Sequence, residues 1–107
     1  MGKNRGMADI ETTRDDSQSR YEARIDGVLA GFAEYQVTHD LVVFTHTEVD
    51  DQFEGRGVGS AIAQYALDDI RAQGTHRVLP VCVFIKGWIG KHPEYATLVY
   101  GYQPPAS

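Results

Sequence analysis

The chain has 107 residues, of which 42% are hydrophobic and 23% charged, as is ordinary for one water-soluble globular domain. The net charge is −5, and no run of lysine or arginine follows the first few residues. This argues against nucleic acid as a partner, because nucleic-acid binding depends on a basic face that neutralises phosphates. The single cysteine excludes an internal disulfide and a multi-cysteine zinc site. Because the four histidines are scattered, we expect no metal.

The N-terminal region shows no targeting signal. No stretch approaches the roughly 20 apolar residues of a membrane span, and no apolar core of a signal peptide is present. We therefore expect a cytoplasmic protein without a membrane partner. Residues 1–18 are polar and charged, which predicts a disordered tail before a domain at residues 19–107. Either Met1 or Met7 can serve as the native start.

Three strands are predicted after the tail. Residues 20–27 alternate and end in Asp26-Gly27, a strong signal for a two-residue hairpin turn. Residues 28–37 follow as the partner strand. Residues 41–49 are rich in β-branched side chains, which favours a third strand. Together they predict an antiparallel three-strand meander.

One amphipathic helix is predicted over residues 58–73, because apolar side chains recur there every three or four residues before Gly74. Residues 76–84 predict a fourth strand, in which Pro80 marks a place where pairing is interrupted. Short helices are expected at residues 85–91 and 92–99, with Pro93 at the first position of the second, and one more short strand after them. The fold class is therefore α+β: a mixed sheet with the meander, a crossover helix, a fourth strand and short C-terminal helices.

A glycine-rich loop lies between the third strand and the helix. In "EGRGVG", residues 54–59, glycines occupy positions 55, 57 and 59. Such a loop lets unpaired backbone N–H groups at a helix N-terminus approach an anion, although a plain tight turn uses the same residues. A Walker loop is excluded because no lysine lies near Gly59. A dinucleotide fingerprint is excluded because Ser60 or Ile62 stands where its last glycine or alanine is needed.

The loop resembles the pyrophosphate-binding loop of the GNAT superfamily of acyl-CoA-dependent N-acyltransferases, written Q/R-x-x-G-x-G/A. Gly57 and Gly59 match its glycine positions, and Glu54 departs from its usual Gln or Arg. A T-H-T-E-V strand, this loop, Cys82 and an H-P-E-Y segment follow one another as in small single-domain GNAT-like proteins that lack the first helices. The resemblance covers about residues 20–100. Val83 departs from it, since those proteins commonly have proline there.

The resemblance implies a GNAT-like fold and an acyl-CoA site. The pantetheine arm would lie between the strand that ends at Val49 and the strand after the helix. Backbone donors and a supporting cation for the pyrophosphate would come from Arg56, Gly57, Val58, Gly59 and Ser60. The implied partners are acetyl-CoA as co-substrate and an amine acceptor.

Four residues are candidates for catalysis. An amine must lose a proton before it attacks a thioester, and Glu48 or His46 on the third strand could remove it; burial would raise the pKa of Glu48. Cys82 could accept the acyl group or protonate the CoA thiolate, and Tyr95 could also supply that proton. Each also has a structural interpretation: a rim carboxylate for Glu48, a half-buried strand residue for His46, and core side chains for Cys82 and Tyr95.

The sequence thus predicts an acetyl-CoA-dependent N-acetyltransferase that works by direct attack, with a variant in which Cys82 carries the acetyl group. Two alternatives stay open: a non-catalytic acyl-CoA-binding or sensing module, and an interaction domain whose glycine loop is only a turn. The sequence does not determine the acceptor amine or the oligomeric state.

Overall fold

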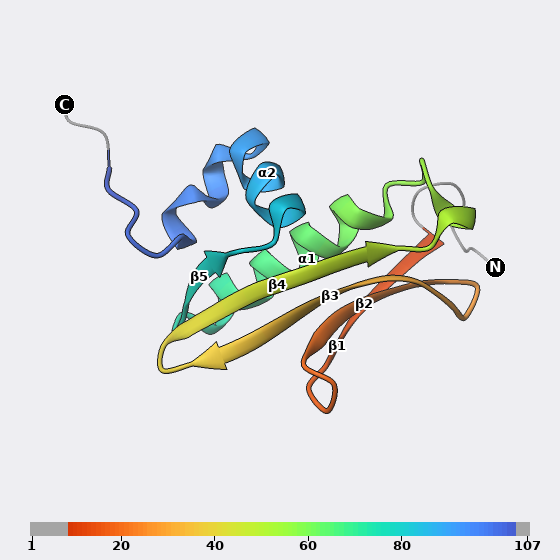
Figure 1. The fold of residues 1–107 in the computed structure, drawn as a ribbon, viewed down its shortest axis with the longest axis horizontal. Coiled ribbons are helices and arrows are strands. Elements are labelled where there is room, and N and C mark those ends of the chain that lie inside the picture. Colours follow the sequence, from red (N-terminus) through yellow and green to blue (C-terminus); the bar gives the residue numbers. More distant parts are fainter. Residues whose placement is uncertain (1–8, 105–107) are drawn as a thin grey trace.

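The computed structural model describes residues 9–104, and in this range the chain forms one five-stranded sheet with its helices on one face (Figure 1). The strands lie side by side in chain order: β1 (Ile10–Asp15), β2 (Arg20–Ile25), β3 (Val28–Thr38), β4 (Leu41–Val49) and β5 (Arg77–Pro80). The first four pair antiparallel, and β5 pairs parallel with β4. The helical elements are η2 (Asp51–Phe53), α1 (Val58–Gln73), α2 (Val83–Lys91) and η3 (Pro93–Leu98). This confirms the predicted α+β mixed sheet.

Strand β1 corrects the prediction of a disordered tail over residues 1–18. Residues 10–15 pair along their whole length with β2, while residues 1–8 lie outside the described range. The strand shows little apolar alternation because it lies at the sheet edge, and a polar contact attaches it to the helix: Arg14 Nη1 lies 2.8 Å from Asp69 Oδ2 in α1. Such a strand depends on distant partners that local composition does not show.

The predicted hairpin and meander are confirmed. Asp26 has φ of 52° and Gly27 has φ of 81°, as a type I′ turn between β2 and β3 requires. A second turn, in which His39 has φ of 53°, joins β3 to β4. The three predicted strands are therefore the last three of a four-strand antiparallel meander.

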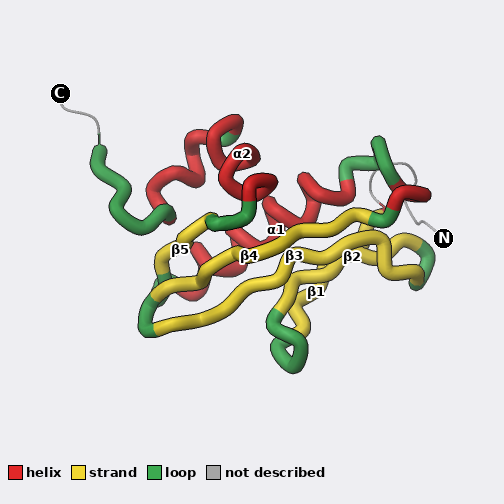
Figure 2. Tube along the Cα trace, viewed as in Figure 1, coloured by secondary structure: helices red, strands yellow, loops and turns green. Residues whose placement is uncertain are grey.

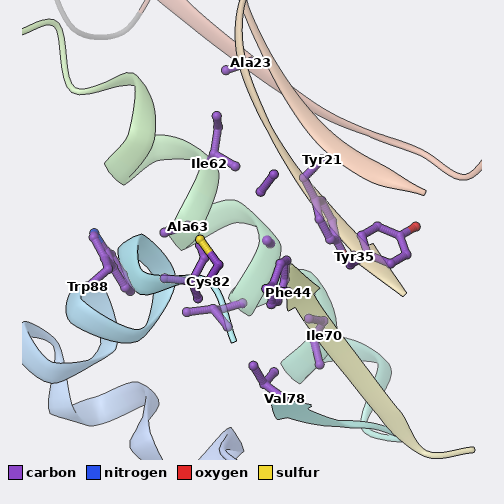
Figure 3. Packing of buried hydrophobic residues seen from close by; sticks show 14 of the residues in the cluster. Tyr21, Ala23, Tyr35, Phe44, Ile62, Ala63, Ile70, Val78, Cys82 and Trp88 are labelled. Atoms are coloured by element: carbon purple, nitrogen blue, oxygen red, sulfur yellow. The ribbon is translucent and has the colours of Figure 1, made fainter. Parts of the chain in front are cut away.

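Helix α1 covers the sheet and has the bounds that the apolar spacing predicts. Its buried residues pack against aromatic side chains of the sheet, among them Tyr21 and Phe44 (Figure 3). Gly74 ends the helix with φ of 70°. Helix α1 and strand β4 both lie close to Gly31 of β3, where an added Cβ would lie 2.7 Å from Glu48 O and 3.0 Å from Val58 Cγ1. Only glycine fits between the helix and the sheet at this point.

The end of the sheet differs from the prediction for residues 76–84. Strand β5 stops at Pro80, which has no N–H to donate, and helix α2 begins at Val83, two residues before the helix expected at 85–91. The helix expected at 92–99 is the 3₁₀ helix η3, with Pro93 at its start. In place of a final strand, Val99 makes one parallel bridge to Val78. No helix within residues 9–104 combines the length and apolarity needed to cross a bilayer.

The face of the sheet opposite α1 carries a buried ion-pair cluster. Glu22 is only 3% exposed and binds Arg20 Nε at 2.7 Å and Arg24 Nη1 at 2.5 Å. Burial alone would raise the pKa of Glu22, but the two guanidinium groups more than offset it and lower that pKa. The Arg20 guanidinium also lies 4.6 Å from the centre of the Phe32 ring.

We expect Gly31→Ala to lower the free energy of unfolding by roughly 1–3 kcal/mol, because the new methyl group meets backbone rather than a movable side chain. Urea denaturation measures the change. The matched control is Gly87→Ala in α2, where an added Cβ meets nothing within 4 Å, so helix propensity should raise stability by about 0.5–1 kcal/mol. Equal effects of the two variants would contradict the close approach at Gly31.

We expect Glu22→Gln to lower the free energy of unfolding at pH 7 by about 2 kcal/mol, since it weakens two charge-assisted hydrogen bonds. The folded-state pKa of Glu22 is lowered, so its contribution is present above the unfolded value near 4.3 and is lost as pH falls through the folded value. The stability difference between wild type and variant should therefore narrow below about pH 4. A difference that stays constant from pH 7 to pH 3 would contradict this account.

Candidate functional site

The first turn of α1 presents backbone N–H groups without protein acceptors. Gly57 is the N-cap residue with φ of 80°, and no side chain caps the helix. The first helical hydrogen bond runs from Ala61 N–H to Gly57 O at 3.0 Å. Within residues 9–104, the N–H groups of Val58, Gly59 and Ser60 therefore have no acceptor, and the first turn contains no acidic residue. Free donors at the positive end of a helix dipole favour an anion.

The loop that leads into this turn lies between β4 and α1 (Figure 2). Glu54 is exposed, and its N–H donates to Asp51 O at 3.2 Å, which ends η2. Arg56 is also exposed, and its guanidinium carbon lies 6.0 Å from the centre of the Phe53 ring. No ion pair engages Arg56 in the part of the chain that the structure describes. A cation is thus available beside the free N–H groups.

Strands β4 and β5 separate close to Cys82. Their pairing ends at Phe44 and Pro80, whereas β4 continues to Val49. Cys82 N–H donates to Phe44 O at 2.8 Å, and Cys82 Sγ lies 3.2 Å from Thr47 Oγ1. The cysteine is 8% exposed and is the N-cap residue of α2 (Figure 3). It therefore lies at the point where the two strands diverge, after the end of β5 and not within a strand as predicted.

A bulge in β4 determines which side chains face this point. Tyr35 pairs with Phe44 and Glu34 with His46, which leaves Thr45 without a partner residue in β3. The alternation of side chains changes there, so Thr47 and Val49 follow Phe44 on the helix side of the sheet. Thr47 was missed by sequence reasoning because a bulge at Thr45 leaves no local signal.

His46 and Glu48 lie on the opposite face of the sheet. Their side chains are 54% and 64% exposed, and His46 Nε2 lies 3.9 Å from Glu48 Oε1. They share this face, and the exposure of Glu48 agrees with its structural interpretation as a rim carboxylate. The structure thus brings His46 and Glu48 together, and it separates them from Thr47 and Cys82.

Tyr95 is buried in η3 against the second half of α1. Its hydroxyl donates to Asp68 Oδ1 at 2.8 Å, and its ring centre lies 4.6 Å from the Arg71 guanidinium carbon and 5.2 Å from the Trp88 ring. The hydrogen bond to Asp68, together with burial, raises the pKa of Tyr95. These contacts agree with the structural interpretation, in which Tyr95 attaches η3 to α1, rather than with proton donation to a thiolate.

Helix α2 also contacts the first turn of α1. Trp88 is buried, and its Nε1 donates to Ser60 Oγ at 2.8 Å, so the Ser60 hydroxyl is engaged while its backbone N–H stays free. His92 stacks on Trp88 with ring centres 3.7 Å apart. Within residues 9–104, no group of three His, Cys, Asp or Glu side chains is placed so that it could hold a metal ion.

The sequence matches a family model described as GCN5-related N-acetyl-transferase over residues 20–98. This match extends from the start of β2 to the end of η3, so it includes the glycine loop, Cys82 and Tyr95. None of the curated proteins searched matches the sequence.

Solved structures share this fold. A GCN5-like protein of Staphylococcus aureus aligns with a TM-score of 0.66 and 18% identity over 90% of this chain and 93% of its own. The ribosomal-protein-S18-alanine N-acetyltransferase of Escherichia coli aligns with a TM-score of 0.59 and 18% identity over 68% of this chain; the match spans 50% of that enzyme's length. A Deinococcus radiodurans protein described as a proposed acetyltransferase aligns with a TM-score of 0.55 and 16% identity. The alignment covers 97% of this chain and 89% of that protein. At these identities the likeness shows the fold alone.

We expect Tyr95→Phe to lower the free energy of unfolding by about 1 kcal/mol, because Asp68 loses a hydrogen-bond donor. This corresponds to a fall in Tm of roughly 4–8 °C for a domain of this size. The control is Tyr102→Phe, which removes the hydroxyl of an exposed tyrosine. An unchanged Tm for Tyr95→Phe, combined with a large loss of turnover, would instead favour a role in proton transfer.

Proposed function

The chain belongs to the GCN5-related N-acetyltransferase family, and we propose that it transfers an acetyl group from acetyl-CoA to an amine. The observation that carries this proposal is the set of free N–H groups at Val58, Gly59 and Ser60, which lie beyond the end of a strand whose neighbour has diverged. An anion site and an open strand edge, one after the other, suit a ligand with a pyrophosphate and a long amide-containing arm.

The open edge of β4 supports the proposed course of the pantetheine arm. Asp50 N–H donates to Ala30 O at 2.8 Å, so at the end of β4 the main-chain groups of alternate residues point toward β3. By this alternation the N–H and C=O groups of Thr47 and Val49 point the other way, where β5 no longer pairs. These groups can hydrogen-bond the amides of the arm. Val49 is therefore proposed to bind through its backbone, with Arg56 beside the pyrophosphate.

Catalysis in this proposal rests mainly on holding the two substrates together. The amine nitrogen attacks the thioester carbonyl, the C–S bond breaks, and the products are an amide and CoA. His46 or Glu48 accepts the proton that the ammonium group must lose, directly or through water. Their place on the open face of the sheet means that the amine would arrive from that face, opposite the helices. Acetyl-CoA and acceptor then meet where β4 and β5 separate.

A second route uses Cys82. Its Sγ lies where the strands diverge and within 3.2 Å of the Thr47 hydroxyl, which could donate to a thiolate. Sγ would take the acetyl group from CoA, and the amine would then take it from Sγ, so that the thiolate is restored. Direct attack is the primary proposal because Cys82 is buried, as a packed core cysteine is.

A binding or sensing module without turnover is the second candidate function. The observation that favours it is the separation of His46 and Glu48 from Cys82 by the thickness of the sheet. In that case the free N–H groups would still hold acyl-CoA, and no amine would be acetylated.

We expect acetyl-CoA to bind the wild-type protein, with Gly57→Val weakening binding at least tenfold because valine is strained at φ of 80°. Isothermal titration calorimetry measures the affinity. The matched control is Gly74→Val, which imposes similar strain at the other end of α1, where φ is 70°, and should leave affinity unchanged. An absence of binding by the wild type, or equal loss in both variants, would contradict the proposed site.

Release of free CoA with a panel of amines then separates the candidates. Turnover in Cys82→Ala favours direct attack, while its loss with binding intact favours the cysteine route. Glu48→Gln and His46→Ala should slow turnover without changing acetyl-CoA affinity. Binding with no turnover for any amine would leave the sensing module as the better account.

A further inference from the structure

The structure explains the two glycines of the G-x-G motif, Gly57 and Gly59, in different ways. Gly57 has φ of 80° and nothing within 4 Å of an added Cβ, so its backbone conformation requires glycine. Gly59 has no such conformation, but an added Cβ would lie 2.7 Å from Phe84 Cζ and within 3.3 Å of two more ring atoms. The residue at position 59 is therefore limited by the ring of Phe84, which contacts the first turn of α1.

Phe84 lies in the first turn of α2, two residues after Cys82. Figure 1 shows α2 lying over α1, and the contact of Gly59 with Phe84 brings the start of the second helix to the start of the first. Phe84 nevertheless stays 42% exposed. A large, partly exposed ring that contacts the first turn of α1, two residues after Cys82, is available to an apolar ligand group.

We propose that Phe84 is a positioning residue whose exposed ring face packs against the pantetheine arm of CoA. This inference rests on the proposed function and deepens it. An arm that runs from the N–H groups at Val58–Ser60 to the divergence point at Cys82 passes the start of α2, where Phe84 lies. The ring then favours CoA over nucleotides without the arm, and Gly59 leaves room for the ring.

The first test compares two probes that share the pyrophosphate: CoA and adenosine 3′-phosphate 5′-diphosphate, which lacks the pantetheine arm. Phe84→Ala should weaken CoA binding about tenfold and leave the affinity for the armless nucleotide within twofold. Phe84→Leu, which keeps an apolar side chain, should restore most of the CoA affinity. The control is Tyr100→Ala, which removes an aromatic ring that is also exposed and should change neither affinity.

The second test is a double-mutant cycle between positions 59 and 84. Gly59→Ala should weaken CoA binding about as much as Phe84→Ala, because the new methyl group displaces the end of a movable ring. In the Phe84→Ala background, Gly59→Ala should cause no further loss. Thermal unfolding of all variants checks that each is folded at the titration temperature.

Three results would overturn the proposal. One is an equal loss of affinity for both probes in Phe84→Ala, which would mean that the ring only stabilises the glycine loop. Another is unchanged CoA affinity in Phe84→Ala. The third is an equal loss of CoA affinity from Gly59→Ala in the wild type and in Phe84→Ala, which would mean that Gly59 contacts the ligand directly. Failure of the wild type to bind either probe would instead remove the proposed function itself.

Discussion

The divergence of β4 and β5 is the constraint on which the rest of the molecule depends. Pairing ends at Pro80, and beyond it the N–H of Cys82 donates to Phe44 O at 2.8 Å. Because a proline cannot continue the ladder, the chain leaves the sheet there and forms α2 from Val83. The departure leaves the edge of β4 open up to Val49, and it carries Phe84 and Trp88 onto the first turn of α1. The open edge of β4 and the contact of α2 with the first turn of α1 thus have one origin.

The features that the sequence predicts well are those with short-range causes. Asp26-Gly27 requires positive φ at two residues, and the apolar stripe of residues 58–73 before Gly74 defines α1 at both ends. Strand β1 was missed because its stability comes from pairing with β2 and from Arg14 with Asp69, 55 residues away. The β4 bulge has no local signal, so the sequence could not show which side chains of β4 face the helices. The glycine loop was recognised, but the contact that limits Gly59 was not.

The predicted catalytic residues occupy three separate places. Cys82 lies with Thr47 on the helix side of the sheet, His46 lies with Glu48 on the open face, and Tyr95 is engaged by Asp68. This arrangement does not bring an acid, a base and a nucleophile together in one cluster. Direct attack needs only a held thioester and one proton acceptor, and the two faces of the sheet can supply them from opposite sides.

The central claim is that the unpaired N–H groups at the start of α1 bind the pyrophosphate of CoA. Titration of the ¹⁵N-labelled protein with CoA, followed through its backbone amide resonances, tests this most directly. The account predicts that the amide signals of Val58, Gly59 and Ser60 shift at the same ligand concentrations at which CoA binds. Binding of CoA with these three signals unmoved would contradict the account.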